Sequence, residues 1–132
     1  MKAVLQVAVG SGLGSGLRFI CDAFGKGWDP GGFPWITFFI NISGSLLIGF
    51  LIGRHAREKS TAGFFCTETF WVTGFCGGFT TFSAFSWQTL DLIHRGEAGL
   101  AAMYAGVSIF AGVAAVALGM VWGRSRKTPP RP

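Results

Sequence analysis

Long apolar stretches alternate along this chain with short segments that carry most of its charged residues. The apolar stretches cover about residues 3–24, 33–53, 64–90 and 98–122. Each can form a membrane-spanning helix, because crossing a hydrocarbon core about 30 Å thick takes about 20 helical residues. The pattern therefore predicts an all-α membrane protein with four transmembrane helices in one domain, residues 1–123, and leaves no room for a soluble domain.

The third apolar stretch carries a signal for a broken helix. Residues 74–85 read Gly-Phe-Cys-Gly-Gly-Phe-Thr-Thr-Phe-Ser-Ala-Phe, in which Gly77 and Gly78 weaken a helix and three hydroxyl side chains follow. A break in hydrocarbon frees backbone N–H and C=O groups, so it persists only where protein or water lines it. Because broken helices also hold ions in membrane proteins, we expect the functional site in the middle of this span.

Positive charge is distributed unevenly between the two ends of the predicted spans. With four spans, the N-terminus, the 54–62 loop and the C-terminal tail share one side of the membrane. That side carries Lys2, Arg54, Arg57, Lys59, Arg124, Arg126, Lys127 and Arg131, and the other carries Lys26 and Arg95. The positive-inside rule places both termini in the cytoplasm. Residues 124–132 are expected to form a basic disordered tail, too short to indicate a nucleic-acid partner.

Composition narrows the classes of function. The 21 glycines predict closely packed helices. Four helices enclose too little space for an aqueous pore, so we expect an oligomer. The three cysteines have neither the pairing nor the spacing of a metal site, and no nucleophile lies near a base in the pattern. An enzyme is therefore not expected.

Polar side chains within the second span form a line along one helical face. Asn41 offers two N–H donors, and Thr37 and Ser45 lie four residues before and after it. Asn41 alone is typical of a hydrogen bond between helices, whereas the line of three favours a polar track. Tyr104 and Ser108 repeat the four-residue spacing in the fourth span, although Ser108 can also bond to its own helix.

The charges within the spans favour an anion as the permeant ion. Arg18, in the first span, either anchors its helix at the interface or attracts anions to an entrance. The carboxylates within the spans lie near span ends, Asp22 at the end of the first and Glu68 near the start of the third. Phe82 and Phe85 follow the expected break, and the edge of an aromatic ring is positive. Donors, ring edges and no central acid suit an anion better than a cation.

These motifs resemble those of the Fluc (CrcB) family of fluoride channels. The resemblance covers essentially the whole chain: Gly-Ser-Gly-Leu-Arg-Phe in the first span, Asn-Ile-Ser-Gly-Ser in the second and the residue 74–86 motif in the third. It implies a passive channel of the bacterial plasma membrane that exports fluoride and protects against its toxicity. It also implies an antiparallel, dual-topology dimer with two pores.

The resemblance further implies roles for individual residues. The pore residues would be Phe82, Phe85, Asn41, Thr81, Ser83, Tyr104 and Ser108. Arg18 would be the family's first-span arginine. A structural sodium ion at the dimer centre would be held by the backbone carbonyls of Gly77 and Thr80.

The chain departs from the family pattern in three ways. Ala84 stands where the family usually has Thr, and Gln88 where Glu is common. The charge bias, eight positive residues against two, is unusual for a chain that inserts in both orientations. Either a homodimer forms despite the bias, or the chain pairs with an oppositely oriented relative.

Two other functions are compatible with four short helices. A proton-coupled multidrug exporter needs an acid inside the first span, where this chain has Arg18 and no acid before Asp22. A non-transporting assembly subunit would explain the glycines by packing. It would not explain the break followed by Thr-Thr-Phe-Ser.

Overall fold

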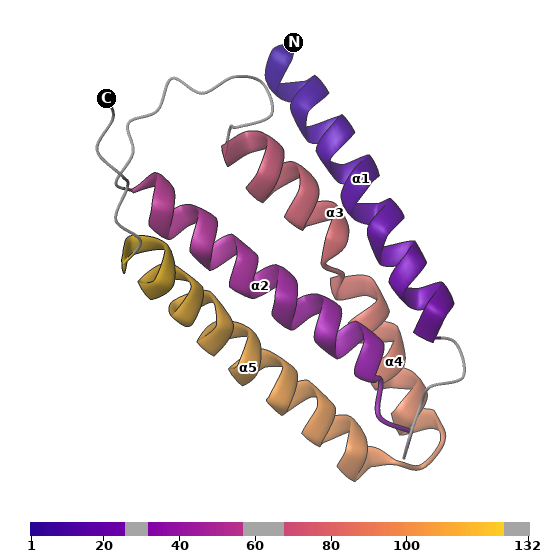
Figure 1. Cartoon of the computed structure of the whole chain (residues 1–132). Helices are drawn as coiled ribbons and strands as arrows, with labels where there is room; N and C mark the ends of the chain where they lie inside the picture. Colours follow the sequence, from indigo (N-terminus) through magenta and orange to yellow (C-terminus); the bar gives the residue numbers. More distant parts are fainter. Residues whose placement is uncertain (26–31, 57–67, 126–132) are drawn as a thin grey trace, which may run out of the picture.

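The computed structural model describes residues 1–25, 32–56 and 68–125. Every regular element in these ranges is helical: α1 (Lys2–Gly25), α2 (Trp35–His55), η3 (Thr69–Cys76), α3 (Gly77–Phe79), α4 (Phe82–His94) and α5 (Ala98–Ser125). The short elements η3, α3 and α4 follow one another along the third span (Figure 1). The predicted all-helical fold is confirmed for the described residues, which form four helical segments with the third interrupted.

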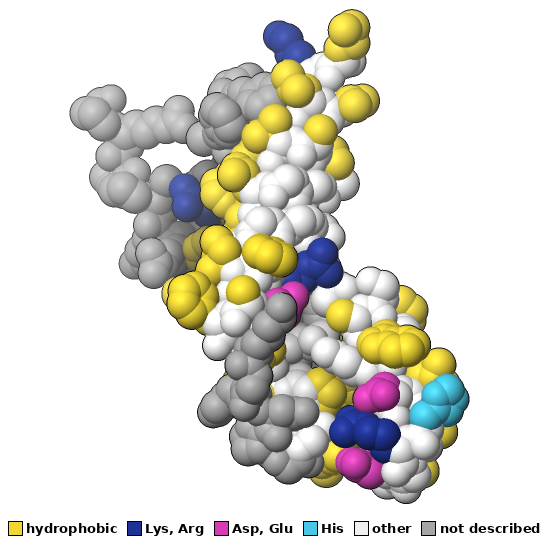
Figure 2. Space-filling model, turned by 90° about the vertical axis from the view of Figure 1, so that its right-hand side faces the viewer, with side chains coloured by type: hydrophobic (Ala, Val, Ile, Leu, Met, Phe, Trp, Pro, Cys, Tyr) yellow, Lys and Arg dark blue, Asp and Glu magenta, His cyan; other side chains and the backbone are white. Residues whose placement is uncertain are grey.

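Three of these helices, α1, α2 and α5, are long and apolar enough to cross a membrane. The third span reaches no such length in one piece, because it stops and restarts. Large apolar side chains are exposed along the flanks, among them Leu13, Phe110 and Leu118. Figure 2 shows such side chains spread over one flank, with charged side chains gathered near its lower end. An apolar surface of this extent marks contact with lipid or another protein.

The helices associate as two side-by-side pairs, α2 with α5 and α1 with the upper part of the third span (Figure 1). In the first pair, glycines bring the two backbones into contact. A Cβ on Gly49 would overlap the carbonyl oxygen of Val116, and a Cβ on Gly119 would overlap that of Leu46. Small residues at such positions let helices in lipid gain close packing.

The second pair combines glycine contacts with hydrogen bonds. A Cβ on Gly10 would lie 2.9 Å from the backbone nitrogen of Phe75. The Ser11 hydroxyl donates to the Gly74 carbonyl at 3.2 Å, and the Ser15 hydroxyl donates to the Gly78 carbonyl at 3.3 Å. η3, which forms part of this pair, is a π-helix, a rare conformation that the sequence pattern did not predict.

The third span breaks later than its glycine pair predicts. Gly77 is helical, with φ −62° and ψ −34°, and the helix continues to Phe79. The extended residues are Thr80 (φ −73°, ψ 158°) and Thr81 (φ −146°, ψ 124°). The physical reason is packing: a Cβ on Gly78 would lie 2.8 Å from the Cα of Ser11, so Gly78 serves the contact with α1.

Some predicted boundaries differ from the structure, and others lie outside it. α5 continues to Ser125, two residues into the predicted tail, because Gly123 still packs against Phe50 of α2. The rest of the tail, the loop at residues 57–62, the start of the third span at 64–67 and Lys26 lie outside the described residues.

Candidate functional site

The break in the third span is held by a side chain from α2. The Nδ2 group of Asn41 donates to the Thr81 carbonyl at 3.0 Å, and the Thr81 N–H donates to Asn41 Oδ1 at 2.8 Å. The Thr81 N–H thus points away from the carbonyl of Gly77, its acceptor in a continuous helix. One amide side chain thereby satisfies both backbone groups of an extended residue inside the span.

Thr81 also caps α4. Its Oγ1 accepts a hydrogen bond from the Ala84 N–H at 3.2 Å and lies 3.1 Å from Ser83 Oγ. The remaining N–H groups of the first turn of α4 have no acceptor within the helix. The helix dipole adds partial positive charge at this end, so an anion is stabilised there.

A cavity of about 290 Å³ lies at this helix start. It is lined by Asn41, Ser45, Ile48, Thr80, Thr81, Phe82, Phe85, Ser108, Ile109 and Gly112. None of these described lining residues is ionisable. The cavity thus combines hydroxyl and amide groups, two aromatic rings and an apolar wall.

Ser108 is the clearest unsatisfied donor in the cavity. Its Oγ is buried and has no hydrogen-bond partner among the described residues. The bond to its own helix that the sequence left open is therefore absent. A buried hydroxyl without a partner costs about 1–3 kcal/mol, so it calls for a ligand or water.

The two phenylalanines differ in their surroundings. Their ring centroids are 5.8 Å apart. The Phe85 ring packs against Tyr104 at 5.2 Å, whereas the Phe82 side chain is 80% exposed. Phe82 therefore forms an edge of the cavity that no described residue covers.

Tyr104 lies next to the cavity but does not line it. It is fully buried, and its hydroxyl donates to Gln88 Oε1 at 2.9 Å. Gln88 Nε2 in turn donates to Thr37 Oγ1 at 2.8 Å. The single proton of the Tyr104 hydroxyl is thus bonded to Gln88 and is not available to an ion.

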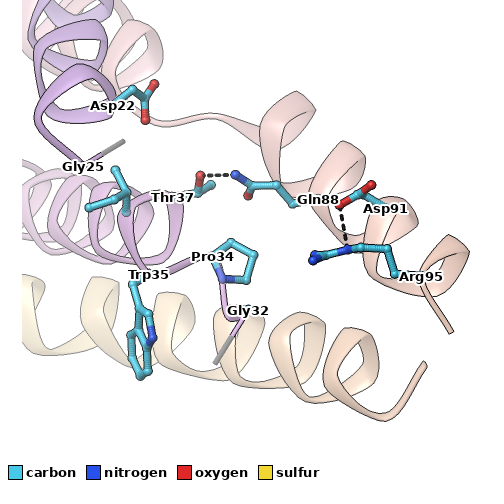
Figure 3. A pocket seen from close by; sticks show the side chains of 10 residues that line it. Asp22, Gly25, Gly32, Pro34, Trp35, Thr37, Gln88, Asp91 and Arg95 are labelled. Carbon is cyan, nitrogen blue, oxygen red and sulfur yellow. Dashed lines mark hydrogen bonds and ion pairs between the residues drawn. The ribbon is translucent and has the colours of Figure 1, made fainter. Parts of the chain in front are cut away.

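Thr37 and Gln88 face a second cavity of about 250 Å³ at the far end of α4 (Figure 3). It is also lined by Asp22 of α1, and by Asp91 and Arg95, which form an ion pair at 3.1 Å. Phe85 and Gln88, one helical turn apart, face the two different cavities. α4 thus borders both cavities, one near its start and one near its end.

The structure brings together six of the ten predicted site residues around the first cavity: Asn41, Thr80, Thr81, Phe82, Phe85 and Ser108. Ser83 and Gly77 are exposed beside the break, Tyr104 is buried behind it, and Arg18 of α1 lines neither cavity. The predicted track Thr37–Asn41–Ser45 divides, because Thr37 bonds to Gln88 and Asn41 bonds to Thr81.

Sequence reasoning missed the structural role of Gln88. A signal was present, since an amide in an apolar helix must find partners, and Thr37 and Tyr104 offered hydroxyls. The pairing itself could not be read from spacing, because the three residues lie on three different helices.

Two carbonyls at the break lack the amides that would bond them in a continuous helix. The Thr81 N–H, four residues after Gly77, bonds to Asn41. The Ala84 N–H, four residues after Thr80, bonds to the Thr81 hydroxyl. These are the carbonyls of Gly77 and Thr80, and free carbonyl oxygens are suitable ligands for a hard cation.

This chain is similar to known proteins over most of its length. The family model described as "CrcB-like protein, Camphor Resistance (CrcB)" matches residues 5–120. A relative from Novosphingobium aromaticivorans is 45% identical over 122 residues, which are 91% of this chain and 94% of the relative. One from Thermus thermophilus is 43% identical over 119 residues, 90% of this chain and 93% of the relative.

Both relatives carry the name "Fluoride-specific ion channel FluC", as does one from Nitrobacter winogradskyi that is 45% identical over 118 residues, 89% of this chain and 91% of the relative. The family match extends from α1 to α5 and includes every residue that lines the cavity at the break. This chain therefore belongs to the CrcB family.

Proposed function

We propose that this protein is a passive fluoride-selective channel that lets fluoride leave the cytoplasm through a bacterial plasma membrane. The cavity at the break carries the proposal. It joins the start of α4, two aromatic rings and the unpartnered Ser108 hydroxyl, and its described lining has no ionisable group. The names of the family relatives supply the identity of the ion.

Selectivity for fluoride follows from size and hydration. Fluoride is small and holds its water tightly, so a narrow path must replace that water with several donors. Chloride is too wide for the same path. The donors must also bind weakly enough for the ion to leave, which favours neutral hydroxyls and ring edges over a fixed cation.

Within this path the residues take different parts. Phe82 and Phe85 offer ring edges, Ser108 and Ser83 offer hydroxyls, and Asn41 retains one N–H after bonding to Thr81. Tyr104 contributes through its ring, which packs against Phe85, because its proton is bonded to Gln88. Arg18 lines neither cavity, which favours the anchoring alternative over an entrance role.

The channel is proposed to be an antiparallel dimer with two pores. Supporting this, the cavity lacks a wall at the exposed Phe82, and a second subunit would supply it. A sodium ion between the subunits fits the two free carbonyls, since two copies would offer four oxygens from Gly77 and Thr80. Bound there, the ion would give these carbonyl oxygens the partner that the break takes from them.

The decisive experiment is fluoride efflux from liposomes that contain only the purified protein, read with a fluoride-selective electrode. Rapid efflux of fluoride but not chloride is the expected result. Absence of efflux from folded protein, and again after co-reconstitution with an oppositely oriented relative, would overturn the proposal. Efflux only with the relative would replace the homodimer by a heterodimer.

A further inference from the structure

Asn41 commits one donor and its acceptor oxygen to the backbone of a single residue. Its amide bonds both the carbonyl and the N–H of Thr81, at 3.0 and 2.8 Å. Two residues of an antiparallel sheet exchange the same pair of bonds when their peptide groups face each other. The Asn41 side chain therefore replaces a strand partner for one extended residue within a helical protein.

This pairing matters because no other described residue bonds the backbone groups of Thr81. The residue is only 8% exposed and extended. An unsatisfied backbone group in hydrocarbon costs several kcal/mol. Without the amide of Asn41, both backbone groups of Thr81 would be left without these bonds. A continuous helix through Thr80 and Thr81 would then compete with the break.

A second feature of α2 fits the same break. One turn after Asn41, a Cβ on Gly44 would overlap the Cγ2 atom of Thr80. α2 thus carries an amide opposite Thr81 and empty space opposite Thr80. Both features of α2 therefore accommodate the extended residues Thr80 and Thr81.

We infer that Asn41 is a positioning residue, which fixes the break in the third helix through the backbone of Thr81 and sets where α4 starts. Besides the one N–H that Asn41 keeps for the ion path, this pairing acts on the ion through α4, Phe82 and Phe85. The inference rests on the proposed function only for its effect on flux, and the pairing itself can be measured without any ion.

The test compares Asn41→Ala with Ser108→Ala as a matched control that removes a donor from the same cavity. Hydrogen–deuterium exchange, read by mass spectrometry in peptides covering residues 79–84, reports the Thr81 amide. In Asn41→Ala we expect this amide to exchange about tenfold faster, with loss of fluoride flux. In Ser108→Ala we expect lower flux and unchanged exchange.

Two results would overturn the inference. Flux lost in Asn41→Ala with unchanged exchange would mean that Asn41 acts only as an ion ligand. Faster exchange with unchanged flux would mean that the pairing does not position the ion path. If the wild-type protein carries no fluoride, the proposed function fails while the exchange comparison still tests the pairing.

Asn41→Asp gives a second test, of nearly the same shape, should Asn41→Ala fail to fold. A protonated carboxyl can repeat both bonds to Thr81. An ionised carboxylate keeps the bond from the Thr81 N–H but cannot donate to the Thr81 carbonyl, and its charge repels that carbonyl oxygen, which loosens the break. Relative to wild type at the same pH, protection of the Thr81 amide is expected to be near normal at low pH and to fall as the pH rises. Protection that is the same at every pH contradicts the pairing, and no ionisable group among the described cavity residues complicates the comparison.

Discussion

α2 and α5 remain helical from end to end, whereas the third span, which packs on α1, stops at Phe79 and restarts at Phe82. α2 and α5 satisfy their backbone hydrogen bonds internally, so their contact requires only that the two backbones can approach closely. Glycines provide it, with Gly49 and Gly53 facing α5 and Gly119 and Gly123 facing α2.

The broken span depends on other helices for its hydrogen bonds. Ser15 of α1 bonds the Gly78 carbonyl just before the break, and Asn41 of α2 bonds Thr81 within it. The α2–α5 pair therefore acts as a packed scaffold, whereas the break frees backbone groups that must be hydrogen-bonded by neighbouring helices. The cavity lies between the break and this α2–α5 scaffold.

The largest expected effect is a loss of stability from a change at the contact between α2 and α5. Gly49→Ala places a Cβ against the Val116 backbone, whose Cα would be 2.9 Å away, so α2 and α5 must separate. We expect the free energy of unfolding to fall by about 3 kcal/mol, because backbone cannot yield as a side chain can. Thermal melting of the purified protein in detergent measures this.

Gly106→Ala is the control, since nothing lies within 4 Å of a Cβ at Gly106. It should melt like the wild type or slightly higher, because alanine favours helix. If both variants lose the same stability, the interlocked glycines are not what holds the pair.

On the broken span the expected effect is on flux rather than stability. Phe85→Ile removes a ring edge from the cavity while keeping an apolar side chain against Tyr104. We expect fluoride efflux from liposomes to fall about tenfold or more, with little change in melting.

Phe110→Ile is its control, because Phe110 is 78% exposed on α5 and lines neither cavity. It should leave efflux unchanged. Normal efflux through Phe85→Ile would remove this ring from the path and leave the hydroxyls to carry the ion.

The sequence predicted the spans well and the break less well, for a physical reason. Hydropathy depends on each residue alone, so α1, α2 and α5 follow directly from it. The break depends on which backbone groups find partners on other helices. Gly77 and Gly78 drew attention because glycine weakens helices, but packing against α1 keeps that stretch helical.

The candidate site shows the same division. Composition and spacing pointed to Asn41, Phe82, Phe85 and Ser108, which the structure brings to one cavity. The sequence did not show which of these donors are free for an ion, because it does not show which protons are already bonded within the protein. Tyr104 is the example, since its predicted donor role meets a hydroxyl bonded to Gln88.

A smaller effect is expected where α1 supports the third span. Ser15→Ala removes the hydroxyl that bonds the Gly78 carbonyl at 3.3 Å. Hydrogen bonds between membrane helices contribute about 0.6–2 kcal/mol, so we expect a loss of about 1 kcal/mol in the free energy of unfolding. Melting in detergent measures it.

Ser43→Ala serves as the comparison, because the Ser43 hydroxyl bonds the Phe39 carbonyl of its own helix at 2.7 Å. That bond links no two helices, and its loss should change the melting temperature less than Ser15→Ala does. Equal losses would mean that the α1 contact rests on packing alone, as in the α2–α5 pair.

The smallest effect concerns the cavity at the far end of α4. Its described charges are the carboxylates of Asp22 and Asp91 and the guanidinium of Arg95, and Arg95 is paired with Asp91. No ion pair joins Asp22 to another described residue that lines this cavity, and its carboxylate should lower the local concentration of anions. If fluoride passes through this cavity, Asp22→Asn should raise efflux about twofold at low salt and leave it unchanged at high salt, where exposed charges are screened.

Asp22→Glu is the control, because it keeps the charge and should behave like the wild type at both salt concentrations. An increase that persists at high salt would come from a change in packing, and no increase at low salt would place the ion path away from this end of α4.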